Sequence, residues 1–269
     1  MKKFDEAVEY LKIGAYKKAQ KILEAIIAKE PRNVKALTNL GIVYKNTGQQ
    51  SKAIEYYLKA IEVDPKMYKA YNNLANIYLL RNEFELAKTS FEKAIKIKPD
   101  YADGYGNLGA YYQTKQNKAL AKRFYNKAEK YGSKSFDVLF NYSSILESEG
   151  NYKKAYELAK QAFDIDAGNT AVCSIMANSL RGLGQLEESR KYYEKAIELD
   201  PYLTSVYPNL LDVLTRLGDK KQANLIHKKM DEFGAETPYW ALKLHKSLKH
   251  RLDTARSFSS RIKSEAQRI

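Results

Sequence analysis

Asparagine recurs at a fixed interval along the chain, and its side chain is chemically suited to binding polypeptides. The series is Asn39, Asn73, Asn107, Asn141 and, after an interruption at Ile175, Asn209, with neighbouring positions 34 residues apart. An amide side chain both donates and accepts hydrogen bonds. A row of them can therefore pair with the main chain of an extended peptide. The alternative is that these amides bond to one another, from helix to helix, inside the protein.

Charged and amide side chains accompany part of this series. They are Lys35, Lys69, Asn72 and Asn76. Each of the two lysines lies four residues, or one helical turn, before an asparagine of the series. The corresponding positions in the next two intervals hold Asp103 and Asp137, so the charge changes sign. We expect the lysines to select acidic groups or a C-terminal carboxylate and so to orient a bound peptide. The alternative is a solvated helix face without a ligand.

Residue types that commonly support catalysis are sparse. The histidines are His227, His245 and His250, and their spacing contains no paired metal-binding motif. His227 falls at a packing position of the pattern described below. Cys173 is the only cysteine, which excludes an intramolecular disulfide and a multi-cysteine metal site, and we expect it to be buried and inert. We therefore predict no enzymatic activity, no catalytic residues, no metal site and no cofactor.

Prolines and glycines mark the ends of the elements that would position these side chains. Pro31, Pro65, Pro99 and Pro201 are separated by 34, 34 and 102 residues, and 102 is three times 34. Proline cannot continue a helix and glycine favours the left-handed turn after one, so both predict regularly spaced helix ends. A repeat of this length is typical of a solenoid.

Small and large residues alternate within each interval at helical spacing. In the second interval Ala53, Tyr57 and Ala60 follow one another by four and three residues, and Gly41 lies twelve residues earlier. This spacing places the three side chains on one helix face. The pattern predicts two amphipathic helices per interval, separated by a Gly or Asn turn, with the small residues allowing the helices to approach closely.

These residues resemble the tetratricopeptide repeat family over about residues 1–237. The resemblance implies an all-α, right-handed superhelical solenoid of antiparallel helix pairs. The seven predicted units are 1–33, 34–67, 68–101, 102–135, 136–169, 170–203 and 204–237. The fourth unit ends in YGSKSF without a proline, which predicts a looser connection, and the seventh is degenerate at His227 and Met230. Residues 238–269 are predicted to form a partial eighth repeat or a C-terminal cap.

In this family the first helix of each pair lines the concave side, so the resemblance places the asparagine series in a groove. It is similar there to the asparagine ladders of some tetratricopeptide superhelices. The predicted peptide-binding residues are Asn39, Asn73, Asn107, Asn141, Asn209, Lys35, Lys69, Asn72 and Asn76. The alternative is that asparagine belongs to the family consensus without a binding role. Asn72 and Asp137 replace two lysines of the clamp found in chaperone-binding members, which argues against that type of adaptor.

Composition restricts the other classes of function. The net charge is +14, and basic residues cluster at 115–130 and 243–268, where they could meet phosphates or anionic lipid. No nucleic-acid-binding motif accompanies them, so we expect a solubilising surface. Apolar runs do not exceed four residues, which argues against a membrane-spanning helix. The N-terminus turns acidic at Asp5 and Glu6, unlike a signal peptide, and the single cysteine suits a reducing cytoplasm.

Three hypotheses follow from these observations. The leading one is a non-enzymatic scaffold that binds an extended segment of a protein partner. The second is self-association through the repeat ends or the convex face, in an assembly such as an organelle coat or pilus machinery; light scattering over a concentration series would detect it. The third is electrostatic binding of nucleic acid or an anionic membrane, for which affinity would fall steeply with salt.

Overall fold

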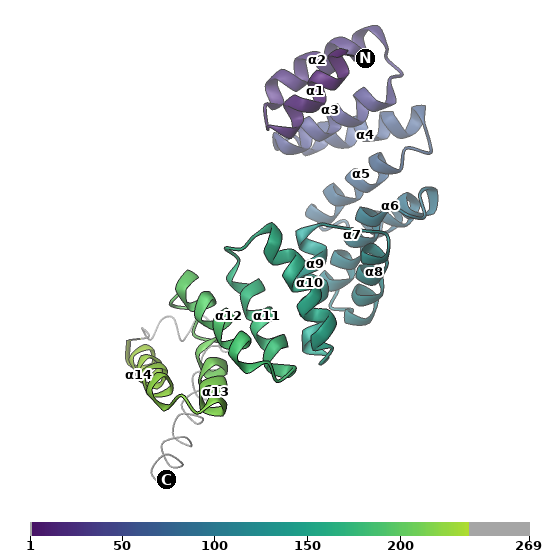
Figure 1. The fold of residues 1–269 in the computed structure, drawn as a ribbon. Helices are drawn as coiled ribbons and strands as arrows, with labels where there is room; N and C mark the ends of the chain where they lie inside the picture. Colours follow the sequence, from purple (N-terminus) through teal and green to yellow (C-terminus); the bar gives the residue numbers. More distant parts are fainter. Residues whose placement is uncertain (1, 237–269) are drawn as a thin grey trace. The chain divides into compact units, whose positions relative to one another are not determined.

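The computed structural model of the protein describes residues 2–236, and these form fourteen α-helices and no strand (Figure 1). The helices are α1 (Lys2–Lys12), α2 (Tyr16–Lys29), α3 (Val34–Asn46), α4 (Gln50–Val63), α5 (Tyr68–Leu80), α6 (Phe84–Ile97), α7 (Ala102–Thr114), α8 (Lys118–Lys130), α9 (Phe136–Ser148), α10 (Tyr152–Ile165), α11 (Thr170–Gly182), α12 (Leu186–Leu199), α13 (Tyr207–Leu217) and α14 (Lys220–Glu236). The predicted all-α class is confirmed. The predicted cap at 238–269 lies outside the described residues. No described helix combines the length and apolar character needed to cross a membrane.

Consecutive helices pack in pairs joined by tight turns. Between α3 and α4, Gly48 has a φ of 78°, a left-handed conformation that glycine adopts without strain. The N–H of Gly48 donates to the carbonyl of Lys45 (3.1 Å), and the N–H of Gln49 donates to that of Tyr44 (2.8 Å). These two bonds satisfy carbonyls that the end of α3 would otherwise leave unpaired. The same arrangement ends the first helix of all seven pairs.

The expected Gly or Asn occupies this left-handed position in six pairs but not in the fourth. Asn82 holds it between α5 and α6, with a φ of 60°. Between α7 and α8 the residue is Gln116, with a φ of 56°, so the prediction is wrong there. The following asparagine has a different role, because Asn117 Oδ1 accepts a hydrogen bond from the N–H of Leu120 (3.1 Å) and caps α8.

The end of α8 is capped by glycine rather than by a proline turn. The N–H of Gly132 donates to the carbonyl of Glu129, and that of Ser133 donates to Ala128, both at 2.9 Å. Gly132 has a φ of 81°, so this is the same left-handed cap that ends the first helices. The cap extends as far as Ser133, which is buried, and the chain divides into its two units directly after it, within the connection that is predicted to be looser.

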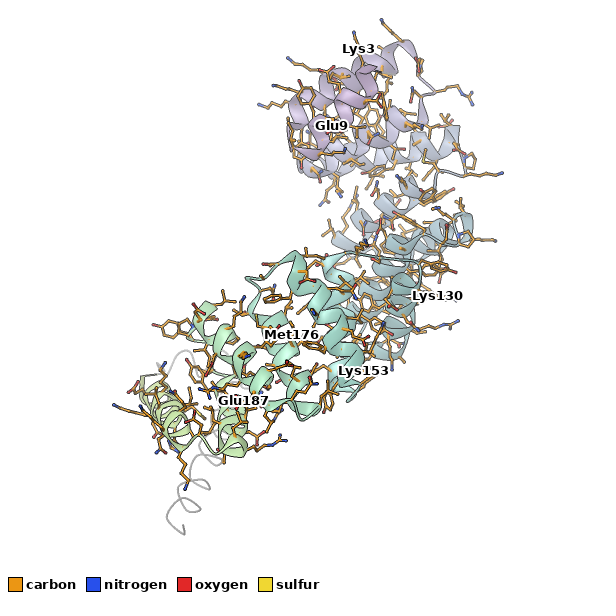
Figure 2. The ribbon with its side chains drawn as sticks, viewed as in Figure 1. Lys3, Glu9, Lys130, Lys153, Met176 and Glu187 are labelled. Atoms are coloured by element: carbon orange, nitrogen blue, oxygen red, sulfur yellow. The ribbon has the colours of Figure 1, made fainter. Side chains whose placement is uncertain are left out.

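The chain forms two compact units, Met1–Ser133 and Lys134–Ile269. The first contains α1–α8, and the described part of the second contains α9–α14. Each unit has its own apolar core, built largely from residues of successive helices. In the second unit Met176 is fully buried, whereas Lys153 and Glu187 are exposed (Figure 2).

The small–large–small pattern forms the core that it predicts. Ala53, Tyr57 and Ala60 of α4 are all fully buried. The ring of Tyr57 packs directly on the backbone of α3 at Gly41. A Cβ added at Gly41 would lie only 2.5 Å from a carbon of this ring. Glycine at position 41 is therefore what allows these two helices to approach so closely.

Removing the hydroxyl of Tyr57 should stabilise the protein. This hydroxyl is fully buried and has no hydrogen-bond partner among the described residues, whereas the Tyr125 hydroxyl donates to Gln113 Oε1 (2.7 Å). A buried polar group without a partner destabilises the folded state. We expect Tyr57→Phe to raise the free energy of unfolding in urea by about 1 kcal/mol and Tyr125→Phe to lower it by about 1 kcal/mol. Equal losses in both variants would contradict the assignment.

Candidate functional site

Three neighbouring first helices of the N-terminal unit carry the centre of the predicted asparagine series. Helix α5 contacts both α3 and α7. Asn39, Asn73 and Asn107 each lie on one of these helices and are half-buried, neither in the core nor fully in solvent. The 34-residue period therefore sets three amides at the same position of three adjacent helices.

The amides differ in what they already bind. Asn107 Nδ2 donates to Asn72 Oδ1 (2.8 Å), which joins α7 to α5, and Asn39 Nδ2 donates to the carbonyl of Lys35 (2.9 Å) in its own helix. Asn72 is only 5% exposed. Asn73 and Asn76 form no side-chain hydrogen bond with any described residue and are half-buried on α5. The two amides with free donors and acceptors thus lie beside an amide pair that joins neighbouring helices.

The two predicted lysines lie in the first turns of α3 and α5. Lys35 and Lys69 are exposed, and neither forms an ion pair within the described part of the chain. The positive end of a helix dipole disfavours a cation in the first turn, so these charges do not stabilise their own helices. Asp103, in the first turn of α7, is favourably placed and exposed. The charge change expected from the sequence therefore falls between α5 and α7.

In the second unit the corresponding positions are engaged in other ways. Asn141 is half-buried on α9, and Ile175 on α11 is buried. Asn209 Nδ2 of α13 lies 3.4 Å from Asn178 Oδ1 of α11, which also accepts a hydrogen bond from the Tyr193 hydroxyl. The amides of α11 and α13 therefore belong to a polar network within the unit rather than to a free row.

An ion-pair network adjoins these amides. Asp212 Oδ2 of α13 lies 3.2 Å from Arg181 Nη1 of α11 and 3.7 Å from Arg216 Nη1 one turn further along its own helix. This network strengthens the link between α11 and α13. The amides of α11 and α13 are therefore held by internal contacts, unlike Asn73 and Asn76 of the first unit.

Two features of the structure were missed by the sequence analysis. One is the role of Asn178 as a hydrogen-bond acceptor. The sequence could have indicated it, because Asn178 lies three repeats after Asn76 and both equivalent positions hold asparagine. The other is a cavity beside α1, where Lys3 occupies the position that Leu37, Tyr71 and Tyr105 hold in the following repeats. A comparison of large residues at that position would have revealed the missing ring.

The residues considered for catalysis have structural surroundings. Cys173 is fully buried, and burial raises the pKa of its thiol, so the reactive thiolate is disfavoured. His227 lies half-buried on α14 with its Nδ1 3.2 Å from Asp231 Oδ2, one turn along the same helix. No group of three or more His, Cys, Asp or Glu side chains in the described residues is arranged to hold a metal ion. His245 and His250 lie outside the described residues.

Comparisons with known proteins identify the repeat. The pattern described as "tetratricopeptide repeat" matches residues 34–67, 68–101, 136–169 and 171–203, about half of the chain. Each matched range contains one helix pair. A comparison with curated protein sequences gives no match.

Solved structures of low sequence identity share the fold. YrrB, described as a TPR protein with an unusual peptide-binding site, is 20% identical with a TM-score of 0.53, over 67% of this chain and 93% of YrrB. PilW, described as a widely conserved type IV pilus biogenesis factor, is 21% identical with a TM-score of 0.54, over 77% of this chain and 94% of PilW. PilF of Pseudomonas aeruginosa is 17% identical with a TM-score of 0.60, over 83% and 96%. At these identities the likeness concerns the fold alone.

Proposed function

The chain belongs to the tetratricopeptide repeat family, whose members serve as protein-interaction scaffolds, and we propose that it binds an extended segment of a partner protein across α3, α5 and α7. The observation that carries this proposal is that two half-buried amides, Asn73 and Asn76, and two exposed lysines, Lys35 and Lys69, have no hydrogen-bond or ion-pair partner for their side chains among the described residues. A half-buried amide with no internal partner has donors and acceptors to offer a ligand.

Main-chain recognition explains why amides rather than specific pockets would form this site. Asn73 and Asn76 would each donate to a peptide carbonyl and accept from a peptide N–H, as a neighbouring strand would. The bond from Asn107 to Asn72 keeps α7 and α5 in register, so these two residues position the surface. Asn39 would extend the contact to α3, because its side-chain oxygen has no hydrogen-bond partner among the described residues. Within the second unit, Asn141 and Asn209 would form a separate contact with the partner.

The charges would set the direction of the bound segment. Acidic groups would lie toward Lys35 and Lys69, and the opposite end of the segment would lie toward Asp103. Since the recognition is by main chain and charge, the scaffold needs no catalytic group or cofactor. We propose that it acts in the cytoplasm, where Cys173 would remain reduced.

Replacing the two free amides should weaken peptide binding without unfolding the protein. A random peptide library selected on the wild-type chain supplies the ligands, and their Kd values are then measured by calorimetry. We expect Asn73→Ala with Asn76→Ala to raise Kd by at least about tenfold, since several hydrogen bonds of about 1 kcal/mol each are lost. The melting temperature should stay within a few degrees of the wild type.

A matched control separates binding from stability. Asn107→Ala removes the 2.8 Å bond to the buried Asn72 and should lower the free energy of unfolding by about 1–3 kcal/mol. A library that yields no binder, or binders whose Kd is unchanged by the Asn73/Asn76 replacement, would remove this surface from the proposed function.

A further inference from the structure

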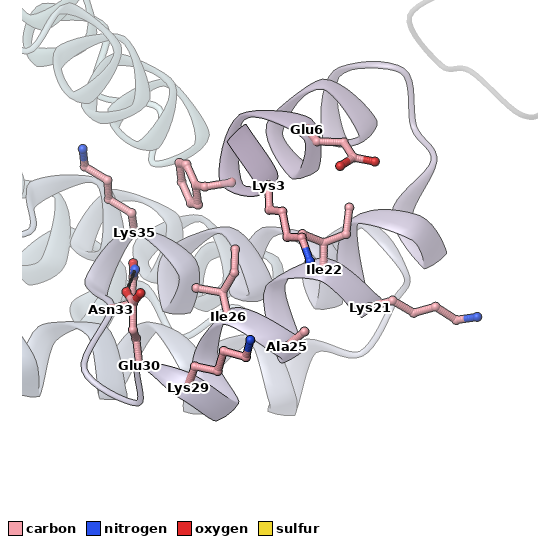
Figure 3. A pocket seen from close by; sticks show the side chains of 11 residues that line it. Lys3, Glu6, Lys21, Ile22, Ala25, Ile26, Lys29, Glu30, Asn33 and Lys35 are labelled. Carbon is pink, nitrogen blue, oxygen red and sulfur yellow. Dashed lines mark hydrogen bonds between the residues drawn. The ribbon is translucent and has the colours of Figure 1, made fainter. Parts of the chain in front are cut away.

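A cavity of about 1020 Å³ opens in the N-terminal helix pair (Figure 3). It lies among α1, α2 and the start of α3. Its apolar lining comes from Phe4, Ile22, Ala25 and Ile26. All but Ala25 are half-buried against the apolar core of the first unit, so the floor of the cavity is continuous with that core.

The origin of this cavity is visible in the repeat pattern. In the pair α7–α8, the ring of Tyr105 stacks on Tyr131 (5.4 Å between centroids) and on Phe124 (6.3 Å). Three repeats earlier in the sequence, the same three positions hold Lys3, Lys29 and Ile22, all of which line the cavity. The first pair therefore lacks the three aromatic rings that fill this place in the fourth. The space that remains is suited to an aromatic side chain.

The rim of the cavity carries more positively than negatively charged side chains. Lys3, Lys21, Lys29 and Lys35 line it, and none of them forms an ion pair with a described residue. In Figure 3, Lys3 reaches toward Ile22, whereas Lys21 and Lys35 extend outward. Of the two glutamates in the lining, Glu30 already accepts a hydrogen bond from Asn33 Nδ2 (2.7 Å). The four lysines outnumber the carboxylates, so the rim favours an acidic ligand.

The fourth and third pairs show how lysine and an aromatic ring combine at this place. The Lys127 ammonium lies 5.1 Å from the centre of the Tyr105 ring, and the Lys93 ammonium lies 5.2 Å from that of Tyr71. A lysine ammonium over a ring face is attracted by the ring's electron density. The position of these two lysines is Ala25 in the first pair, so a ring bound in the cavity would instead meet the ammonium groups of Lys3 and Lys29, which occupy the ring positions themselves.

We propose that this cavity binds an aromatic side chain carried by an acidic segment of a partner protein. The missing rings define the aromatic anchor, and the unpaired lysines define the acidic flanks. This site goes beyond the surface on α3, α5 and α7, with which it shares only Lys35. Charge argues against two other occupants: residues 243–268 of this chain are strongly basic, and a second copy carries the same net charge of +14.

The test uses the full chain and three synthetic heptapeptides labelled with fluorescein. One has tryptophan at its centre with three acidic residues on each side, the second has alanine in place of tryptophan, and the third has lysines in place of the acids. We expect the first to bind, the second to bind at least about tenfold more weakly because an anchor ring is lost, and the third not to bind. Equal binding of the first two, or no binding of the first, would overturn the proposal.

Two variants and a matched control locate the binding. Lys3→Tyr with Lys29→Tyr gives the first pair the two rings that Tyr105 and Tyr131 provide in α7–α8. This variant should abolish peptide binding while preserving or raising the melting temperature. Lys21→Glu with Lys29→Glu keeps the cavity open and should weaken binding at least about tenfold through charge alone. Lys17→Glu, on the same helix but outside the lining, should leave Kd nearly unchanged. A Kd equally affected by Lys17→Glu would indicate non-specific attraction and contradict a built site.

Two further outcomes would reassign the cavity. If the tryptophan peptide binds only after Trp240→Ala, the cavity is occupied by the chain's own C-terminal segment, and the partner proposal fails. If light scattering shows a dimer that Lys3→Tyr with Lys29→Tyr dissociates, the occupant is a second copy. None of these variants changes Asn73 or Asn76, so the peptides selected for the α5 surface should bind them normally whichever result is obtained.

Discussion

Replacing Phe91 by alanine is expected to lower the free energy of unfolding of the first unit by about 3–5 kcal/mol. The ring lies on α6 and is fully buried, in one cluster with Ala75, Ala87, Leu108 and Tyr111. These neighbours come from α5, α6 and α7, so the ring contacts both its own pair and the next one. Its loss would remove apolar contacts and leave a cavity that rigid helices fill only partly.

The repeat architecture makes this effect larger than a local one. A repeat stack is stabilised by contacts between neighbours, so loosening α6 weakens the attachment of the pairs on either side. Urea unfolding followed by circular dichroism measures the loss. Leu86→Ala is the matched control, because Leu86 is on the same helix but 51% exposed, and it should cost less than about 0.5 kcal/mol. Equal costs for the two variants would show that Phe91 is not in a dry core.

The helix pairs could be predicted from the sequence because their determinants are local and periodic. Ala53, Tyr57 and Ala60 share one helix face by spacing alone, and all three are fully buried as expected. The left-handed turns could be predicted wherever glycine or asparagine marks them, as at Gly48. Gln116 could not, because the geometry of the pair imposes a positive φ on a residue type that rarely adopts it.

The candidate site could be predicted only in part from the sequence, because its chemistry depends on hydrogen-bond partners in other helices. The period places Asn73 and Asn107 at equivalent positions, yet one is free and the other is bonded to Asn72. That difference depends on side-chain rotamers and on the offset between α5 and α7, which a 34-residue period does not encode. The cavity beside Lys3 was harder still to predict, because it arises from rings that the first pair lacks, and a repeated spacing identifies only residues that are present.

The protein should lose its fold in alkaline solution, and tyrosine burial is the cause. Burial raises the pKa of Tyr57 and Tyr193 well above the usual value of 10, and both side chains are fully buried. Burial, with the Glu24 carboxylate beside the hydroxyl, raises the pKa of Tyr44 to about 12. In the unfolded chain these groups ionise near pH 10, so the folded state holds protons that the unfolded state has released.

The sign of the pH dependence follows directly. Below pH 10 both states keep the tyrosine protons and the stabilisation is complete; above pH 10 it falls as pH rises, by about 1.4 kcal/mol per pH unit for each such tyrosine. With Tyr44, Tyr57 and Tyr193 acting together, we expect cooperative loss of helical circular dichroism between pH 10 and 12, with tyrosinate absorbance rising in the same step. Tyr57→Phe keeps the ring and removes one ionising group, so its transition should move to higher pH. Tyr202→Phe, at a ring that is 78% exposed, should leave the transition in place. Tyrosinate absorbance that rises to completion with helicity intact would mean that these hydroxyls ionise in the folded protein, and that burial does not protect them.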